Sequence, residues 1–151
     1  MTLVSPGWFE VLGVEPVSGR TFRPEDWGLD APPRLVVTAG LARRLFGTTE
    51  AVGRRLVAGF GAMVEAEIVG VVEDLRLGGP SDEPAPTFFQ PHAPFGIYYV
   101  TVLARTRALD LATLERIRAA VEGTVPDLQW RRRRPSSTAC TTASRSKGSS
   151  L

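Results

Sequence analysis

One segment near the start of the chain, Val4 to Val14, constrains the fold more than any other feature, together with the Gly-Arg-Thr-Phe sequence that follows it. Its pattern predicts a strand end, a short helix and a glycine turn. We expect the hydroxyl of Ser5 to cap this helix, because serine accepts hydrogen bonds from the free N–H groups of a first turn. Pro6 suits the first helical position, where no donor is needed. Gly13 is expected to end the helix with a positive φ.

The same short helix would present one apolar face, formed by Trp8, Phe9 and Leu12. Such a face can dock on a core but offers no catalytic group. The segment therefore indicates architecture rather than chemistry.

Hydrophobic periodicity in the rest of the chain predicts short strands alternating with short helices, which indicates an α+β fold. The run from Met63 to Leu75 first alternates apolar and acidic residues and then becomes continuously apolar. We therefore expect one face of this strand to be exposed at first and both faces to be buried later. The other expected elements are strands at 35–38, 54–58 and 97–104, a hairpin turn at 59–62, a helix at 40–46 capped by Gly47, and a loop at 23–33.

Two further elements are predicted from their end signals. The residues 87–90 are expected to form a short edge strand that Pro91 ends, because proline cannot donate to a ladder. A helix is expected to begin at Asp110, a good N-cap residue, and to be stopped by Gly123 and Pro126.

Several blocks of the sequence resemble one known family in order and spacing. The segment 4–13 with the later Gly-Arg-Thr-Phe is similar to the opening of the MacB-like periplasmic core domain of FtsX-type ABC transporter permeases. Blocks at 34–56, 68–76, 86–91 and 102–106, and the helix before 126–128, also resemble that family, so the resemblance covers residues 4–128. Two departures are that Ala39-Gly40 replaces a usual Asn-Glu pair and that the loop 47–50 is shorter than the common version.

The resemblance implies a mixed two-lobe domain, with lobe one at about 1–33 plus 97–130 and an inserted lobe at about 34–96. It implies no catalytic, cofactor-binding or metal residues, and we expect no cofactor and no enzyme activity. The family-motif residues, expected to have structural roles, are Ser5, Pro6, Gly7, Phe9, Gly13, Gly19, Arg20, Phe22, Gly53, Gly70, Asp74, Arg76 and Pro91.

The function implied by the resemblance is that of an extracytoplasmic domain which relays conformational change to substrates or partners during export. The implied partners are the transmembrane part of a permease, a cytoplasmic ATPase and a second copy of the domain. The implied location is the periplasmic side of the inner membrane, although we expect this chain alone to carry no signal or membrane segment. The sequence names no transported substrate.

Charge divides the chain of 151 residues into two parts, although its formal net charge is only +2. Residues 1–130 contain all 16 acidic residues and have a net charge of −4, whereas residues 131–151 contain no acid and carry +6. The body shows no basic face with aromatic platforms, so we expect no nucleic-acid partner. The segment 131–151 is basic and Ser/Thr-rich; we expect it to be disordered, with a frameshift or truncation as its hypothetical origin.

The residues that could carry chemistry lack the surroundings that catalysis needs. The single histidine, His92, lies in a proline-flanked loop, and the single cysteine, Cys140, lies in the basic segment without an activating partner. No phosphate-binding loop is present, because the only lysine is Lys147. We read the remaining candidates, the acidic groups Glu25, Asp26, Asp30, Glu73, Asp74, Asp82 and Glu83, as solvated loop residues.

An alternative function remains open at this point, a stand-alone binding module for a hydrophobic ligand or peptide. Its hydrophobic groove would use the aromatic residues Trp8, Phe88, Phe89 and Tyr98. Aromatic residues more often pack in cores, so a filled cleft would count against this alternative. A hydrolase is a third possibility that requires carboxylates or His92 to converge in one cavity.

Overall fold

The computed structural model describes residues 1–28, 30–58, 63–77, 83–92, 99–106, 110–124, 128–131 and 139–145. It confirms the α+β class, because mixed β-sheet and helices make up the described chain. Two compact units are present, Met1–Phe95 and Gly96–Leu151, and each is described by itself.

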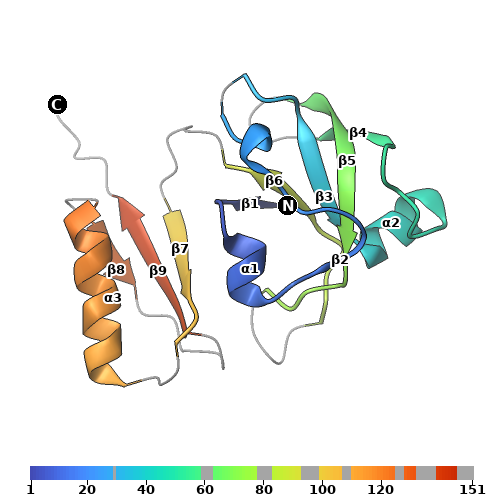
Figure 1. Ribbon diagram of the computed structural model, residues 1–151. Coiled ribbons are helices and arrows are strands. Elements are labelled where there is room, and N and C mark those ends of the chain that lie inside the picture. The colour runs from blue at the N-terminus through green and yellow to red at the C-terminus, as the bar shows by residue number, and fades with distance from the viewer. Residues whose placement is uncertain are drawn as a thin grey trace, which may run out of the picture. The chain divides into compact units, whose positions relative to one another are not determined.

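The first unit is built around one mixed sheet in which strands distant in sequence lie side by side (Figure 1). The strand order is β1-β6-β3-β5-β2, with β4 also paired to β5. The pairs β1–β6 and β3–β5 are parallel, whereas β3–β6, β2–β5 and β4–β5 are antiparallel. The strands are β1 (Thr2–Val4), β2 (Pro16–Gly19), β3 (Arg34–Thr38), β4 (Arg55–Ala58), β5 (Val64–Val72) and β6 (Phe88–Pro91).

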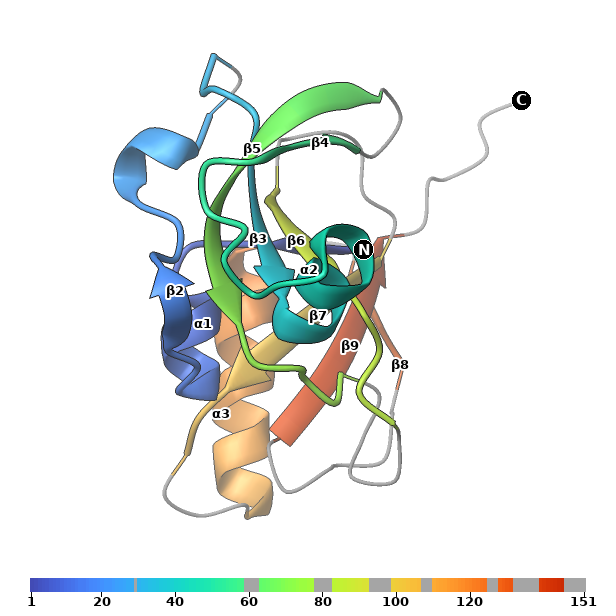
Figure 2. The ribbon, with the colours of Figure 1, turned by 90° about the vertical axis from the view of Figure 1, so that its right-hand side faces the viewer.

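The sheet has a hydrophobic core on each face, because successive side chains of a strand point to opposite sides. One core joins Leu35 and Val37 of β3 to Ala42 of helix α2 (Ala39–Phe46). The other joins Val36 of the same strand to Phe9 of helix α1 (Trp8–Leu12). Figure 2 shows α2 in front of the strands of this sheet. The two cores make the central strands buried on both sides.

The central strand β5 confirms the predicted change in burial along its length. Its first residues are exposed apart from Ala66, and Ile68 to Val72 are all buried. The antiparallel pairing of β4 with β5 also agrees with the predicted hairpin, whose turn at 59–62 lies outside the described residues. Strand β6 corrects a prediction, since it lies between β1 and β3 and is no edge strand. Because β1 is distant in sequence, the residues around β6 give no local sign of this parallel pairing.

The first helix corrects the predicted cap. Helix α1 begins at Trp8, its N-cap is Gly7 with φ 80°, and no side chain caps it. Ser5 contributes its carbonyl oxygen instead, which accepts the N–H of Trp8 at 3.2 Å, so Pro6 lies in the preceding turn. A glycine can take the left-handed conformation that this turn requires, and the helix begins two residues later than predicted. Gly13 ends the helix at φ 68°, as predicted.

Helix α2 agrees with its prediction at both ends. Gly47 follows its last residue with φ 73° and donates its N–H to the carbonyl of Arg43 at 2.8 Å. At the start, the hydroxyl of Thr38 accepts from the N–H of Leu41 at 3.4 Å. The same hydroxyl accepts the N–H of Thr87 at 3.0 Å, which ties the helix start to the segment before β6.

The second unit contains one helix and a three-stranded antiparallel sheet of order β7-β9-β8. The N–H of Thr113 donates to the carboxylate of Asp110 at 2.7 Å, so the predicted cap of the helix is present. Gly123 does not stop this helix, which continues to Thr124, because a glycine is tolerated in a last turn; Pro126 lies outside the described residues. The elements are β7 (Tyr99–Ala104), α3 (Leu111–Thr124), β8 (Leu128–Arg131) and β9 (Ala139–Arg145).

The division into two lobes stays a prediction, and the sheet pairing bears on where its segments lie. Strands β1 and β2, expected in lobe one, are hydrogen-bonded into the same sheet as β3 and β5, expected in the inserted lobe. The grouping of residues 97–130 with lobe one stays a prediction. Within the basic segment, β9 pairs with β7 and β8; residues 132–138 and 146–151 lie outside the described residues, and the expected disorder of the segment stays a prediction.

Candidate functional site

The most developed polar cluster of the first unit is centred on Asp26, whose side chain is fully buried. One guanidinium nitrogen of Arg20 lies 2.5 Å from one carboxylate oxygen, and its other nitrogen lies 3.2 Å from the second oxygen. The side chain of Arg34 donates to the same carboxylate, and the backbone N–H of Arg23 donates at 2.8 Å. Three segments of chain therefore converge on one carboxylate.

These contacts control the charge of the cluster. Burial of the Asp26 carboxyl raises its pKa, but the hydrogen bonds from Arg20, from the Arg23 N–H and from Arg34 outweigh burial and bring the pKa to about 2. The hydrogen bond to Asp26 likewise raises the pKa of Arg20 above its ordinary value. Both groups are thus charged at any physiological pH.

Sequence reasoning missed Asp26, which we expected to be a solvated loop acid. The residue lies in a 3-10 turn, η1 (Pro24–Asp26), and its burial depends on two arginines contributed by the end of β2 and the start of β3. The usable signal was Arg20 in the Gly-Arg-Thr-Phe sequence, because a partly buried arginine needs an acidic partner.

Arg34 is incompletely satisfied by this arrangement. Its Nε is buried and has no hydrogen-bond partner among the described residues, while its terminal group donates to Asp26. The side chain as a whole is 23% exposed, as is that of Arg20. Both arginines therefore reach the surface with donors beyond those that Asp26 uses, since a guanidinium has five N–H groups.

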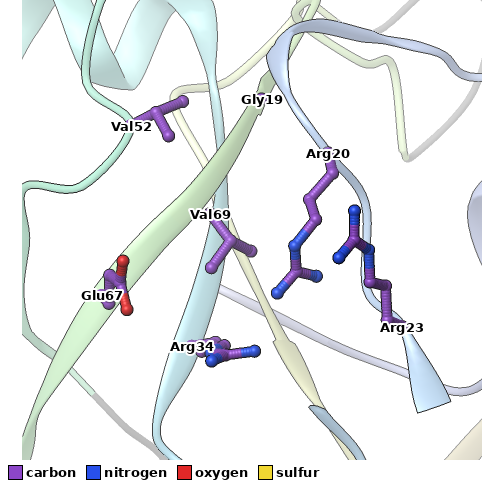
Figure 3. Close-up of a pocket in the computed structure, with 7 residues that line it drawn as sticks. All are labelled: Gly19, Arg20, Arg23, Arg34, Val52, Glu67 and Val69. Carbon is purple, nitrogen blue, oxygen red and sulfur yellow. The ribbon is translucent and has the colours of Figure 1, made fainter. Parts of the chain in front are cut away.

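A pocket of about 320 Å³ opens over these arginines (Figure 3). Arg20 and Arg23 approach it from the segment that follows β2, and the side chain of Val69 lies between them and Glu67. The charged lining is thus mainly cationic, and the apolar lining comes from two valines. The lining residues are Gly19, Arg20, Arg23, Arg34, Val52, Glu67 and Val69.

The glycines of β2 and β5 position Arg20 at this pocket. Gly19 and Gly70 are partners in the antiparallel pairing of these strands. A Cβ on Gly70 would lie 2.0 Å from the carbonyl oxygen of Arg20, and one on Gly19 would lie 2.4 Å from the carbonyl oxygen of Val69. The N–H of Arg20 donates to that Val69 oxygen at 3.0 Å. Only glycine permits so close an approach of two backbones.

Comparison with protein families gives a match over residues 1–123 to the MacB-like periplasmic core domain. The chain belongs to the MacB-like periplasmic core domain family. Membership indicates a periplasmic domain of an ABC-transporter-type permease, and therefore an extracytoplasmic location. Comparisons with curated proteins and with solved structures each returned no match. Among the residues that the structure describes, no helix combines the length and apolar character needed to cross a membrane.

The Gly-Arg-x-Phe sequence of this MacB-like domain contributes three different contacts. Gly19 allows the close approach to β5, and Arg20 binds Asp26. Phe22 packs in the core on the α1 side, with its ring 6.0 Å from that of Phe9 and 5.7 Å from that of Trp27. The motif thus joins the sheet edge, the arginine pocket and one core.

Asp74, another of the expected motif residues, connects the end of β5 to the start of α2. Its carboxylate accepts the N–H of Gly40 at 2.8 Å. A Cβ on Gly40 would lie 2.7 Å from that oxygen, so glycine leaves room for the carboxylate. Asp74 is therefore no purely solvated acid, which corrects that expectation.

The other expected motif residues lie apart from the pocket. Gly53 has φ 81° and donates to the carbonyl of Ile68 at 2.8 Å, and Pro91 pairs with Val4 at the end of β6. Arg76 is exposed in the segment after β5.

The aromatic residues proposed for a hydrophobic groove are packed or divided between the two faces of the sheet. Phe89 is fully buried, and its ring centroid lies 5.1 Å from that of Trp8. Phe88 packs against the opposite core, and Tyr98 lies outside the described residues. The described part of the chain therefore does not join these residues in one groove.

The remaining candidates for chemistry also stay apart. His92 is exposed, and its N–H donates to the carbonyl of Val4 at 2.7 Å, which extends the β1–β6 pairing. No group of three or more His, Cys, Asp or Glu side chains that could hold a metal ion occurs among the described residues.

Proposed function

We propose that this chain is a non-enzymatic extracytoplasmic domain of an FtsX-type export permease that relays conformational change to substrates or partner proteins. In this proposal it works with the transmembrane part of the permease and a cytoplasmic ATPase, and it pairs with a second copy of the domain. The family match over residues 1–123 is the observation that carries the proposal.

A relay requires a body that moves without deforming, and the first unit has features that support this role. Its central strands are buried on both faces, and the segment after β2 is fixed by the Asp26 ion pairs and the Gly19–Gly70 contact. Packed interiors deform little under load, so a displacement applied at one edge would move the whole sheet.

Spin labelling of the full-length permease in lipid nanodiscs tests this relay. Labels at Val17 and Leu45, which are exposed, report a distance within the first unit, in a background from which native cysteines have been removed. A single label at Val57 reports the distance to the same residue of a second copy. The relay predicts an unchanged distance within the unit and a changed distance between copies when ATP is added. If the distance between copies does not change when ATP is added, in a permease complex shown to hydrolyse ATP, the proposal is contradicted.

The basic segment has its own test. We propose that this segment arose from a shifted reading frame. Translation of the DNA beyond the codon for Trp130 in all three frames tests this origin. A further strand, a linker and apolar segments of about 20 residues in another frame would support the frameshift. An in-frame continuation would contradict it, and would agree with the pairing of β9 in the second unit.

The alternative of a hydrophobic-ligand module has no specific observation in its favour. Trp8, Phe88 and Phe89 contribute to the two cores, and the pocket over the arginines is lined mainly by charged side chains.

A further inference from the structure

We propose that the pocket over Arg20, Arg23 and Arg34 binds a carboxylate, presented as an Asp or Glu side chain by a protein partner. The chemical class follows from the lining, which offers three guanidinium groups from separate positions around one opening. Guanidinium groups bind carboxylates through charge-assisted, often bidentate, hydrogen bonds.

The charge balance favours an anion with a single charge. The lining carries three arginines and the carboxylate of Glu67, and Asp26 adds a second carboxylate behind them. The lining and Asp26 together carry one positive charge, and Glu25 adds a negative charge outside the lining, 3.9 Å from Arg23. A side chain with a single negative charge is therefore better matched to the pocket than a dianion. A phosphate dianion would leave excess negative charge beside Glu67 and is disfavoured.

Two of the arginine side chains are already fixed by the fold before any ligand binds. Asp26 fixes Arg20 and Arg34 in place, so binding would not have to order these two long side chains. Both remain 23% exposed. Arg23 is held by fewer contacts, with 61% of its side chain exposed and only a 3.9 Å contact to Glu25.

The apolar part of the pocket fits the stem of an acidic side chain. Val69 lies at the floor with 6% exposure, and Val52 lies at the rim with 44% exposure. The methylene groups of a glutamate or aspartate would cover these valines while the carboxylate reaches the arginines. A free inorganic anion would leave the valines exposed.

The proposal rests on the proposed function in one respect, the protein partner that supplies the acidic side chain. The pocket itself can be tested on the isolated chain, without a permease or nucleotide. A failed relay experiment would thus leave the binding result intact, and failed binding would leave the relay intact.

The test is an NMR titration of the 151-residue chain with N-acetyl-glutamate amide, which carries one carboxylate, and with its neutral glutamine analogue. We expect saturable shifts in the N–H signals of Gly19, Val52 and Val69 with the glutamate compound only. The expected Kd is about 1–10 mM, in line with the affinity of a small polar fragment. The binding should weaken as salt is added.

Two exposed residues allow charge to be changed with little effect on folding. Arg23→Gln should weaken binding about two- to fivefold, and Glu67→Gln should strengthen it by a similar factor, the range expected for exposed charge pairs. The matched controls are Arg55→Gln and Glu65→Gln, which lie on β4 and β5 and pair with each other outside the pocket. They should change the Kd less than about 1.5-fold.

The outcomes are decisive in either direction. Two results together support a carboxylate site: shifts at the pocket signals that saturate, and a Kd that rises in Arg23→Gln and falls in Glu67→Gln. Absence of saturable shifts overturns it, as does equal binding of the glutamine analogue. Tighter binding of inorganic phosphate than of the glutamate compound overturns the carboxylate class and indicates a phosphate-bearing ligand.

Discussion

Gly70 lies opposite Gly19 across the β2–β5 pairing, and the carbonyl oxygen of Arg20 occupies the place where a Cβ of residue 70 would be, at 2.0 Å. Neither partner of this contact is the end of a flexible side chain, so a larger residue must displace a strand. The edge strand β2 and the arginine pocket beside it therefore depend on the absence of one methyl group.

We expect Gly70→Ala to destabilise the first unit by about 3 kcal/mol, because overpacking against backbone cannot relax by a rotamer change. The matched control is Gly53→Ala, which has open space around it but a φ of 81° and should cost about 1 kcal/mol from backbone strain alone. Urea unfolding followed by the NMR signals of Val37 and Val71 gives both values. Equal losses in the two variants would show that crowding at Gly70 is unimportant.

Removal of the charge at Asp26 should be costly because it leaves two arginines without their buried partner. For Asp26→Asn we expect a loss of about 2–4 kcal/mol, below the full range for a buried pair since both arginines are partly exposed. Glu25→Gln, at a neighbouring and exposed position, should change stability by less than about 0.5 kcal/mol. The same unfolding measurement compares them, and a small loss for Asp26→Asn would contradict the cluster as described.

Acid should weaken the first unit through the same residue. The pKa of Asp26 is lowered from 3.8 to about 2, so the folded state binds the proton less readily than the unfolded state. The ionised Asp26 carboxylate contributes up to about 2 kcal/mol to the free energy of unfolding. This contribution is present in full above pH 4 and is lost as the pH falls from about 4 to 2. Urea unfolding of the native chain and of Asp26→Asn at pH 5 and pH 2.5 measures it. If both proteins lose stability equally over this range, other carboxylates are responsible.

The contact between Asp74 and Gly40 should stabilise the start of α2. We expect Asp74→Ala to cost about 1 kcal/mol, because the variant leaves an N–H of the first turn without its acceptor and removes an anion from the positive end of the helix. Hydrogen exchange at the Gly40 and Leu41 amides should speed up locally. Glu73→Gln, exposed and adjacent, should leave both measurements unchanged.

The elements that sequence could predict are those with a local signal. Strand β3, helix α2 and strand β5 have dense apolar patterns, and Gly13, Gly47 and Asp110 are end signals that the structure confirms. Strand β2 was missed because its residues are mostly exposed and include a proline, so it joins the sheet by backbone contacts that leave no hydrophobic pattern.

The candidate site was less predictable because it forms from residues whose contacts are tertiary. Arg20 was recognised as a motif residue, but Asp26 has the local sequence of a solvated turn, and Arg34 that of a strand end. The Arg20–Asp26 pair spans only six residues, whereas the Arg34–Asp26 pair also needs the start of β3, which is held beside β5. The predicted cap at Ser5 was wrong because the helix begins after Gly7, whose φ of 80° forms the N-cap without any side-chain hydrogen bond.

The position of β6 between β1 and β3 has a consequence for the order in which the chain can fold. Thr2 pairs with Phe89, so β1 cannot find its partner until nearly the whole unit has been made. Closing such a long loop is entropically expensive, and contacts of this kind form late. During synthesis the free edge of β6 would be a transient template for pairing with another chain, and β1 seals it at the end.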